Sequence, residues 1–68
     1  MHTLINKEGK PVNVGDTARD IRGDIVIING WKRPTWINGD GLIYITTEDN
    51  KFYSEHSPRM CGMEFKAN

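Results

Sequence analysis

The sequence has few of the features that indicate a secreted or membrane protein. Its 68 residues include one cysteine and three prolines. One cysteine cannot form an intramolecular disulfide, whereas small secreted domains usually contain several, so we expect a reducing cytoplasm. No apolar run reaches the roughly 18 to 20 residues of a membrane span, and the first residues have no signal-peptide pattern. We therefore expect no membrane association.

The sequence also lacks an excess of charge of either sign. Nine basic side chains balance nine acidic ones, which removes the general attraction to nucleic acid and to anionic membranes. Residues 1–35 carry six basic and four acidic side chains and residues 36–68 carry three and five, an asymmetry too small to indicate a partner. A chain of this length forms one domain, residues 1–68, whose core is too small to enclose a sizeable substrate cavity.

Turn residues separate short segments rich in Ile, Val, Thr and Tyr, a pattern typical of an all-β fold. The strongest predicted strand is 24–31, and a second, 41–47, forms a hairpin with 51–54 through Glu48, Asp49 and Asn50. Weaker segments complete the prediction: a hairpin of 4–6 with 12–14, a strand over 17–21, an irregular or 3-10 turn over 58–62, and a strand over 63–65.

Four to five short antiparallel strands are too few for a two-sheet sandwich, and a flat sheet of that size would expose one apolar face. We therefore predict a small β-barrel. Its predicted core consists of Val12, Val14, Ile21, Ile25 or Val26, Ile27 or Ile28, Ile43, Ile45, Tyr53, Met63 and Phe65.

Support for catalysis or metal binding is weak. His56 and Cys61 match no zinc motif, so we predict no metal and no other cofactor. An activated Cys61 with His56 as base would need an oxyanion site, which a barrel without a pocket does not provide. The recurrence of Asp16, Asp20 and Asp24 fits paired carboxylates or turn-forming side chains, and the second interpretation is favoured because Asp16 and Asp24 follow glycines. We predict that the chain is not an enzyme.

The segment 31–36 contains the clearest candidates for a binding site. Trp31 and Trp36 flank Lys32 and Arg33, a grouping that suits either contact with a protein or stacking on the bases of single-stranded nucleic acid. The structural alternative is that one indole, in particular Trp31 at a strand end, closes the bottom of the barrel.

Two further side chains extend this candidate surface. If Ile43 and Ile45 point inwards, the two-residue period of a strand turns Leu42 and Tyr44 outwards, where Tyr44 near Trp36 would enlarge an apolar patch. The predicted protein-binding set is Trp31, Lys32, Arg33, Trp36, Leu42 and Tyr44. The alternative nucleic-acid-binding set is Arg19, Arg22, Lys32, Arg33 and Trp36.

The order of short motifs resembles a group of small uncharacterised proteins of tailed bacteriophages and prophages. The motifs are Val14-Gly15-Asp16, Asp20-Ile21-Arg22-Gly23-Asp24, Gly30-Trp31, Pro34, 41–45, 53–58 and Cys61-Gly62-Met63-Glu64-Phe65. The resemblance implies an SH3-like barrel, akin to KOW and Tudor modules, in the cytoplasm of an infected bacterium. The chain departs from the group's pattern at His56-Ser57, where an aromatic residue precedes the proline. No catalytic residues are implied.

Three hypotheses of function follow. The first is a non-enzymatic phage accessory protein that binds, and inhibits, a host bacterial protein. The second is a nucleic-acid-binding module of the KOW or Tudor type, for which binding would depend steeply on salt. The third is a homo-oligomer formed by pairing of exposed strand edges.

Overall fold

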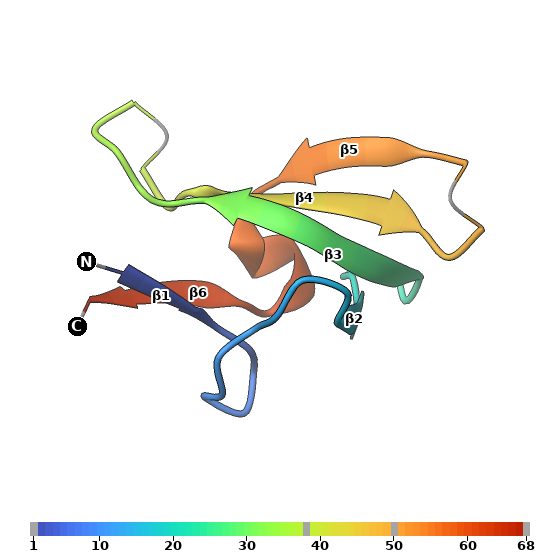
Figure 1. The fold of residues 1–68 in the computed structure, drawn as a ribbon, viewed down its shortest axis with the longest axis horizontal. Helices are drawn as coiled ribbons and strands as arrows, with labels where there is room; N and C mark the ends of the chain where they lie inside the picture. The colour runs from blue at the N-terminus through green and yellow to red at the C-terminus, as the bar shows by residue number, and fades with distance from the viewer. Residues whose placement is uncertain (1, 38, 50, 68) are drawn as a thin grey trace.

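The computed structural model describes residues 2–37, 39–49 and 51–67 and confirms an all-β fold (Figure 1). The elements in chain order are β1 (His2–Ile5), β2 (Thr17–Arg19), β3 (Ile25–Lys32), β4 (Leu42–Thr47), β5 (Tyr53–His56), the 3-10 turn η1 (Pro58–Cys61) and β6 (Glu64–Ala67). They form a four-stranded sheet, β2-β3-β4-β5, and a two-stranded sheet, β1-β6, both antiparallel. The described residues form six strands in two separate sheets rather than a closed barrel, so the predicted count of four to five strands is wrong.

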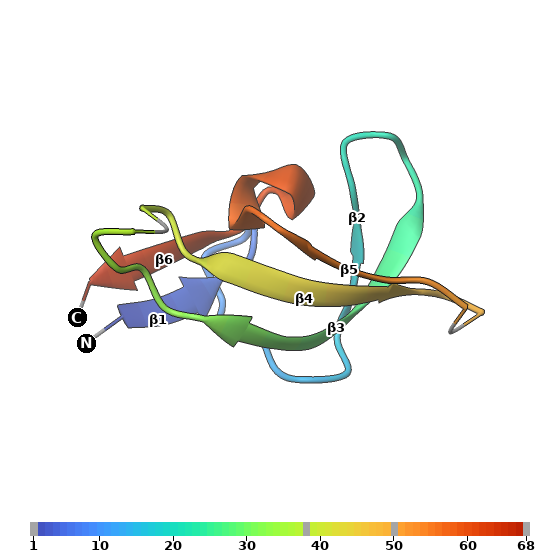
Figure 2. The same ribbon diagram turned by 90° about the horizontal axis from the view of Figure 1, so that it is seen from above.

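The two-stranded sheet lies against one face of the larger sheet, with η1 beside it (Figures 1 and 2). We call the covered face of the larger sheet the inner face and the opposite face the outer face. The core lies between the sheets and takes side chains from both of them and from η1. Its buried residues are Leu4, Val12, Val26, Ile28, Ile43, Ile45, Cys61 and Met63, with Ala18, Trp31 and Phe65 packed against them.

A β-bulge in β3 decides which side chains reach the core. Val26 and Ile28 point inwards at the usual two-residue spacing, and strict alternation would place Gly30 next. The register instead shifts between Ile28 and Gly30, so that Trp31 pairs with the buried Ile43. An extra residue on one strand reverses the faces that follow it. The bulge thus turns Trp31 to the inner face.

Local side-chain contacts explain where strands begin and end. The side-chain oxygen of Asn6 accepts hydrogen bonds from the amides of Glu8 and Lys10 at 2.9 and 3.0 Å, which closes the turn after β1. The 3-10 turn η1 confirms the irregular or 3-10 turn predicted over 58–62. The Ser57 side chain caps its start by accepting a hydrogen bond from the amide of Arg59.

The predicted strands are confirmed for the most part, but one pairing differs. Residues 4–6 and 12–14 were predicted to form a hairpin, yet only an isolated bridge joins Ile5 to Pro11, and β1 pairs along its length with β6. The predicted strand over 17–21 ends at Arg19, because the next residue begins a turn in which the amide of Gly23 bonds to the carbonyl of Asp20. The β4–β5 hairpin is confirmed, although Asn50 lies outside the described residues.

Three predicted core residues are exposed. Val14 is 66% exposed because it lies in the turn before β2, and Ile21 is 78% exposed in the β2–β3 turn. Tyr53 is 60% exposed because it pairs with Thr46, on the outer face. Buried side chains absent from the predicted core are Leu4, Pro58, Cys61 and the polar Asp20. The ambiguous positions in β3 are resolved in favour of Val26 and Ile28.

Candidate functional site

The loop between β3 and β4, residues 33–41, is the part of the molecule that best fits the predicted binding site. Both of its ends are attached to the smaller sheet and to η1. Arg33 Nε donates to the carbonyl oxygen of His2 at 3.2 Å, and Arg59 Nε lies 3.4 Å from Asp40 Oδ2. Because its two ends are fixed, the loop projects from one end of the sheet in a defined direction (Figures 1 and 2). Asn38 of this loop lies outside the described residues.

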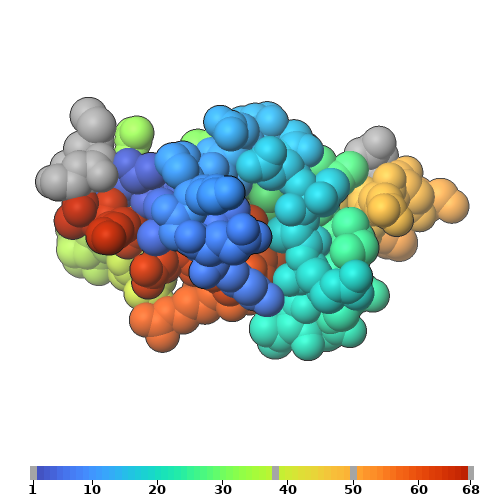
Figure 3. Space-filling view, turned by 90° about the horizontal axis from the view of Figure 1, so that it is seen from below, coloured from blue at the N-terminus to red at the C-terminus, as the bar shows by residue number. Residues whose placement is uncertain are grey.

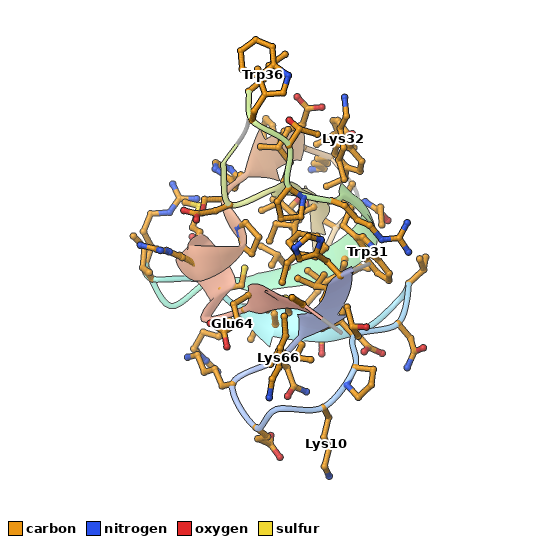
Figure 4. The ribbon with its side chains drawn as sticks, turned by 90° about the vertical axis from the view of Figure 1, so that its left-hand side faces the viewer. Lys10, Trp31, Lys32, Trp36, Glu64 and Lys66 are labelled. Atoms are coloured by element: carbon orange, nitrogen blue, oxygen red, sulfur yellow. The ribbon has the colours of Figure 1, made fainter. Side chains whose placement is uncertain are left out.

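The tip of the loop carries two exposed apolar side chains. Trp36 is 93% exposed and Ile37 is 78% exposed. The amide of Ile37 donates to Thr35 Oγ1 at 3.2 Å, and the amide of Gly39 donates to the carbonyl oxygen of Thr35 at 2.9 Å. Thr35 therefore holds the backbone on both sides of the tip, and the Trp36 indole points away from the body of the protein (Figure 4). The predicted exposure of Trp36 is confirmed.

Trp31 does not belong to this surface. Its indole is half-buried and packs against the core from the inner face, and Figure 4 shows it well separated from Trp36. The structure thus favours a packing role for Trp31, which was the alternative to a binding role. The two indoles do not flank Lys32 and Arg33 in space, because the bulge in β3 reverses the face on which Trp31 lies.

Leu42 and Tyr44 lie on the outer face, as the alternation predicted. Lys32 pairs with Leu42 at the base of the loop, and Tyr44 lies two residues further along β4, opposite Gly30. The ring that contacts Tyr44 is that of Tyr53, with ring centroids 6.3 Å apart and planes inclined by 21°. Lys32, Leu42 and Tyr44 thus form a continuous outer-face strip that starts at the loop.

The alternative nucleic-acid set is divided between two ends of the sheet. Arg19 pairs with Ile25 at the start of β3, whereas Lys32 ends that strand, about 20 Å away at roughly 3.3 Å per residue. Arg22 is also held at the far end, 3.3 Å from Asp20 and 3.9 Å from Asp24. Arg19 and Arg22 therefore do not form one cationic surface with the loop.

Cys61 and His56, the two groups considered for catalysis, are not arranged as a nucleophile and its base. Cys61 is buried, and burial, followed by the charge of Asp20, raises the pKa of its thiol despite the opposing effect of Lys7. His56 Nε2 lies 3.0 Å from Ser54 Oγ. The thiol is therefore protonated and enclosed at neutral pH, a poor state for a nucleophile. Within the described ranges, no three His, Cys, Asp or Glu side chains are grouped closely enough to hold a metal ion.

The recurring aspartates form turns, as the favoured interpretation stated, but the residues that do so are Asp16 and Asp20 rather than Asp16 and Asp24. Asp16 accepts a hydrogen bond from the amide of Asn13 at 2.9 Å. Asp20 is buried and accepts hydrogen bonds from the amides of Arg22 and Asp24 at 2.9 and 3.0 Å. Burial raises the pKa of the Asp20 carboxyl. The two amide hydrogen bonds and the Arg22 guanidinium lower this pKa by more than burial raises it, so the pKa is lowered overall.

The candidate-site prediction missed two residues that the structure adds. Ile37 lies beside Trp36 at the loop tip, and Tyr53 stacks on Tyr44. The exposure of Ile37 could have been predicted from the sequence. Ile37 follows Pro34 and Trp36 in a loop, where no strand packs an apolar side chain into the core. The Tyr53 contact depends on the β4–β5 register, which the sequence does not specify to one residue.

No helix among residues 2–37, 39–49 and 51–67 has the length and apolarity needed to cross a membrane. Comparison of the chain with protein-family models, curated proteins and solved structures finds no match.

Proposed function

We propose that this chain is a non-enzymatic accessory protein of a tailed bacteriophage that binds a protein of its bacterial host, with the β3–β4 loop as the contact surface. The observation that carries the proposal is the exposure of Trp36 and Ile37 at the tip of a loop whose two ends are anchored. A tryptophan buries about 150–250 Å² when it enters a pocket, and tryptophans dominate binding energy at protein interfaces.

The anchoring of the loop supports this proposal because binding is weakened by the entropy lost when a flexible segment becomes ordered. The contacts of Arg33 with His2 and of Asp40 with Arg59 restrict the loop before any partner arrives. The outer-face strip of Lys32, Leu42 and Tyr44 continues from the loop and would supply the rim of the interface.

Inhibition of the bound host protein is the consequence we expect for a small binder without a catalytic group, and the host cytoplasm is the compartment we propose. The resemblance to phage proteins underlies these two points. The packing of a four-stranded sheet against a second sheet supports the further proposal that the fold is an open relative of the SH3-like barrel.

The nucleic-acid alternative receives less support from the charges. Near Trp36 the predicted cations are Lys32 and Arg33, and the Arg33 guanidinium already donates to His2. Binding to phosphates strengthens with each cation that reaches them, so the separation of Arg19 and Arg22 from the loop weakens this hypothesis.

The test is affinity capture from bacterial lysate, with and without nuclease, followed by binding measurements on the purified candidate. Three baits are compared: the wild type, Trp36→Ala at the loop tip, and Phe52→Ala, which removes another exposed aromatic ring at the opposite end of the sheet. We expect one host protein to be captured by the wild type and by Phe52→Ala, to survive nuclease, and to be lost with Trp36→Ala. Capture of nucleic acid alone, removed by nuclease or moderate salt, would support the alternative instead.

A further inference from the structure

A groove lies at the end of the molecule opposite the β3–β4 loop. The groove is lined by residues of the β2–β3 and β4–β5 turns and by the adjoining ends of β3 and β4. Figure 3 shows the β4–β5 end of the molecule, in orange and yellow, projecting away from the chain termini. Val26 and Ile45 form part of the floor of the groove, and the 69% exposed ring of Phe52 stands on one wall. The groove has a volume of about 550 Å³ and is lined by Asp20, Arg22, Asp24, Ile25, Val26, Ile45, Thr47, Glu48, Asp49 and Phe52.

The groove combines an apolar floor with an acidic rim. Four carboxylates and one guanidinium line it, so its formal charge is −3 (one minus four). Asp20 and Asp49 are used in turn hydrogen bonds, whereas Glu48 is exposed and Asp24 comes no closer than 3.9 Å to Arg22. An occupant that fits this chemistry has an apolar side chain for the floor and positive charge for the rim.

The chain itself carries such a segment. The β3–β4 loop has Lys32 and Arg33 at its base and the exposed Trp36 and Ile37 at its tip. The loop and the groove lie at opposite ends of the long axis of the molecule, which is 33 Å long (Figures 1 and 2). The loop cannot reach the groove of its own chain, but it can reach that of another copy.

We propose that copies of this chain associate head to tail, with the loop of residues 33–41 of one copy seated in the groove of the next. Trp36 contacts the Phe52 ring and the apolar floor, and Lys32 faces the carboxylates of Asp24 and Glu48. Such a heterologous contact leaves one loop and one groove free in every open oligomer, so association continues with concentration beyond the dimer unless a ring closes. Because the charges on the rim of the groove are exposed, salt weakens the head-to-tail contact. This contact does not depend on the existence of a host partner.

The test is sedimentation velocity of the full chain over a concentration series at low and high salt. We expect the wild type to sediment faster as concentration rises, and less so at high salt. Trp36→Ala, which lacks the loop anchor, and Phe52→Ala, which lacks the groove wall, are each expected to remain monomeric. Their mixture is expected to form dimers and nothing larger, because the intact loop of one variant fits the intact groove of the other.

Charge variants distinguish this contact from pairing of strand edges. Glu48→Lys at the groove is expected to reduce association. Mixing it with Lys32→Glu is expected to restore open chains, because the intact loop of Glu48→Lys fits the intact groove of Lys32→Glu and the two reversed charges pair at the other contact. Glu55→Lys makes the same change of charge on the exposed edge strand β5 and is expected to have no effect. A wild type that stays monomeric at every concentration, a monomeric mixture of Trp36→Ala with Phe52→Ala, or loss of association only in Glu55→Lys would each overturn the proposal. Capture of a host protein by Phe52→Ala is unaffected by any of these results.

Discussion

The backbone of Gly41 lies directly against the ring of Phe65. A Cβ atom on Gly41 would lie 2.5 Å from Cε2 of Phe65 and 2.8 Å from the carbonyl oxygen of Lys32. Gly41 precedes β4 in the four-stranded sheet and Phe65 is in β6 of the smaller sheet. This close approach is a point where the two sheets pack together at the base of the β3–β4 loop, so its disruption should affect both.

Replacement of Gly41 by alanine should therefore destabilise the protein strongly. Gly41 has a φ of +82°, which is unfavourable for alanine, and the added methyl group overlaps the Phe65 ring. We expect a loss of about 2–5 kcal/mol in the free energy of unfolding from these two effects together. Urea denaturation measures it.

Gly9→Ala is the matched control for that variant. Gly9 has a similar φ of +80°, but nothing lies within 4 Å of its added Cβ atom. We expect it to lose only about 1–2 kcal/mol, the cost of the left-handed backbone conformation. Equal losses for the two variants would mean that the Phe65 contact contributes nothing.

Neighbouring isoleucines in β3 test the assignment of the two faces. Ile28 is fully buried, whereas Ile27 is half-buried on the outer face. We expect Ile28→Val to lower the free energy of unfolding by about 1 kcal/mol through the loss of one buried methylene, and Ile27→Val to change it much less. The reverse order would show that the strand register is shifted by one residue.

The sequence predicts those parts of this fold that depend on neighbouring residues. The consecutive β-branched residues of β3 and the alternation around Ile43 and Ile45 identify strands, because both are local patterns. The pairing of β1 with β6 depends on contacts between the two ends of the chain. The bulge lies at Asn29-Gly30, a dipeptide that is also typical of hairpin turns. The sequence therefore does not predict that Trp31 points inwards.

The same distinction applies to the candidate site. Trp36 is correctly predicted to be exposed because it lies in a polar loop with no strand periodicity around it. The groove near Phe52 is missed because its walls come from two turns that are far apart in sequence.

Acid should remove the part of the stability that depends on Asp20. The folded state lowers the pKa of this carboxyl below 3.8, so its stabilising effect is complete above pH 3.8 and is lost as the pH falls through the folded-state pKa. We expect wild type to melt at a higher temperature than Asp20→Asn near neutral pH, and the difference to shrink below pH 3.8. Thermal melts of both proteins between neutral pH and about pH 2 measure it.

Asp24→Asn is the control for the acid series. It removes the same charge from the same turn, but at a carboxylate that is exposed and accepts no amide hydrogen bond among the described residues. We expect it to follow the wild type at every pH. A difference between wild type and Asp20→Asn that stays constant across the series would contradict the role given to the Asp20 charge.

Cys61 should react slowly in the folded protein. Its side chain is buried, and the raised pKa keeps the thiol protonated near neutral pH. We expect labelling by a thiol-specific reagent to be slow in buffer and fast in denaturant, with the rate in buffer following the opening of the fold. Fast labelling in buffer, equal to that of a small-molecule thiol, would show that Cys61 is accessible and would reopen its consideration as a nucleophile.

The two tryptophans should differ sharply in contact with solvent. Trp36 is 93% exposed, whereas Trp31 is half-buried against the core. In Trp31→Phe the emission comes from Trp36 alone, and we expect it to lie at long wavelength and to be quenched efficiently by acrylamide. In Trp36→Phe the emission comes from Trp31, and we expect a shift to shorter wavelength and weaker quenching, both lost on unfolding. Equal quenching of the two variants would place Trp31 at the surface, and the bulge at Asn29-Gly30 would then not direct it to the inner face.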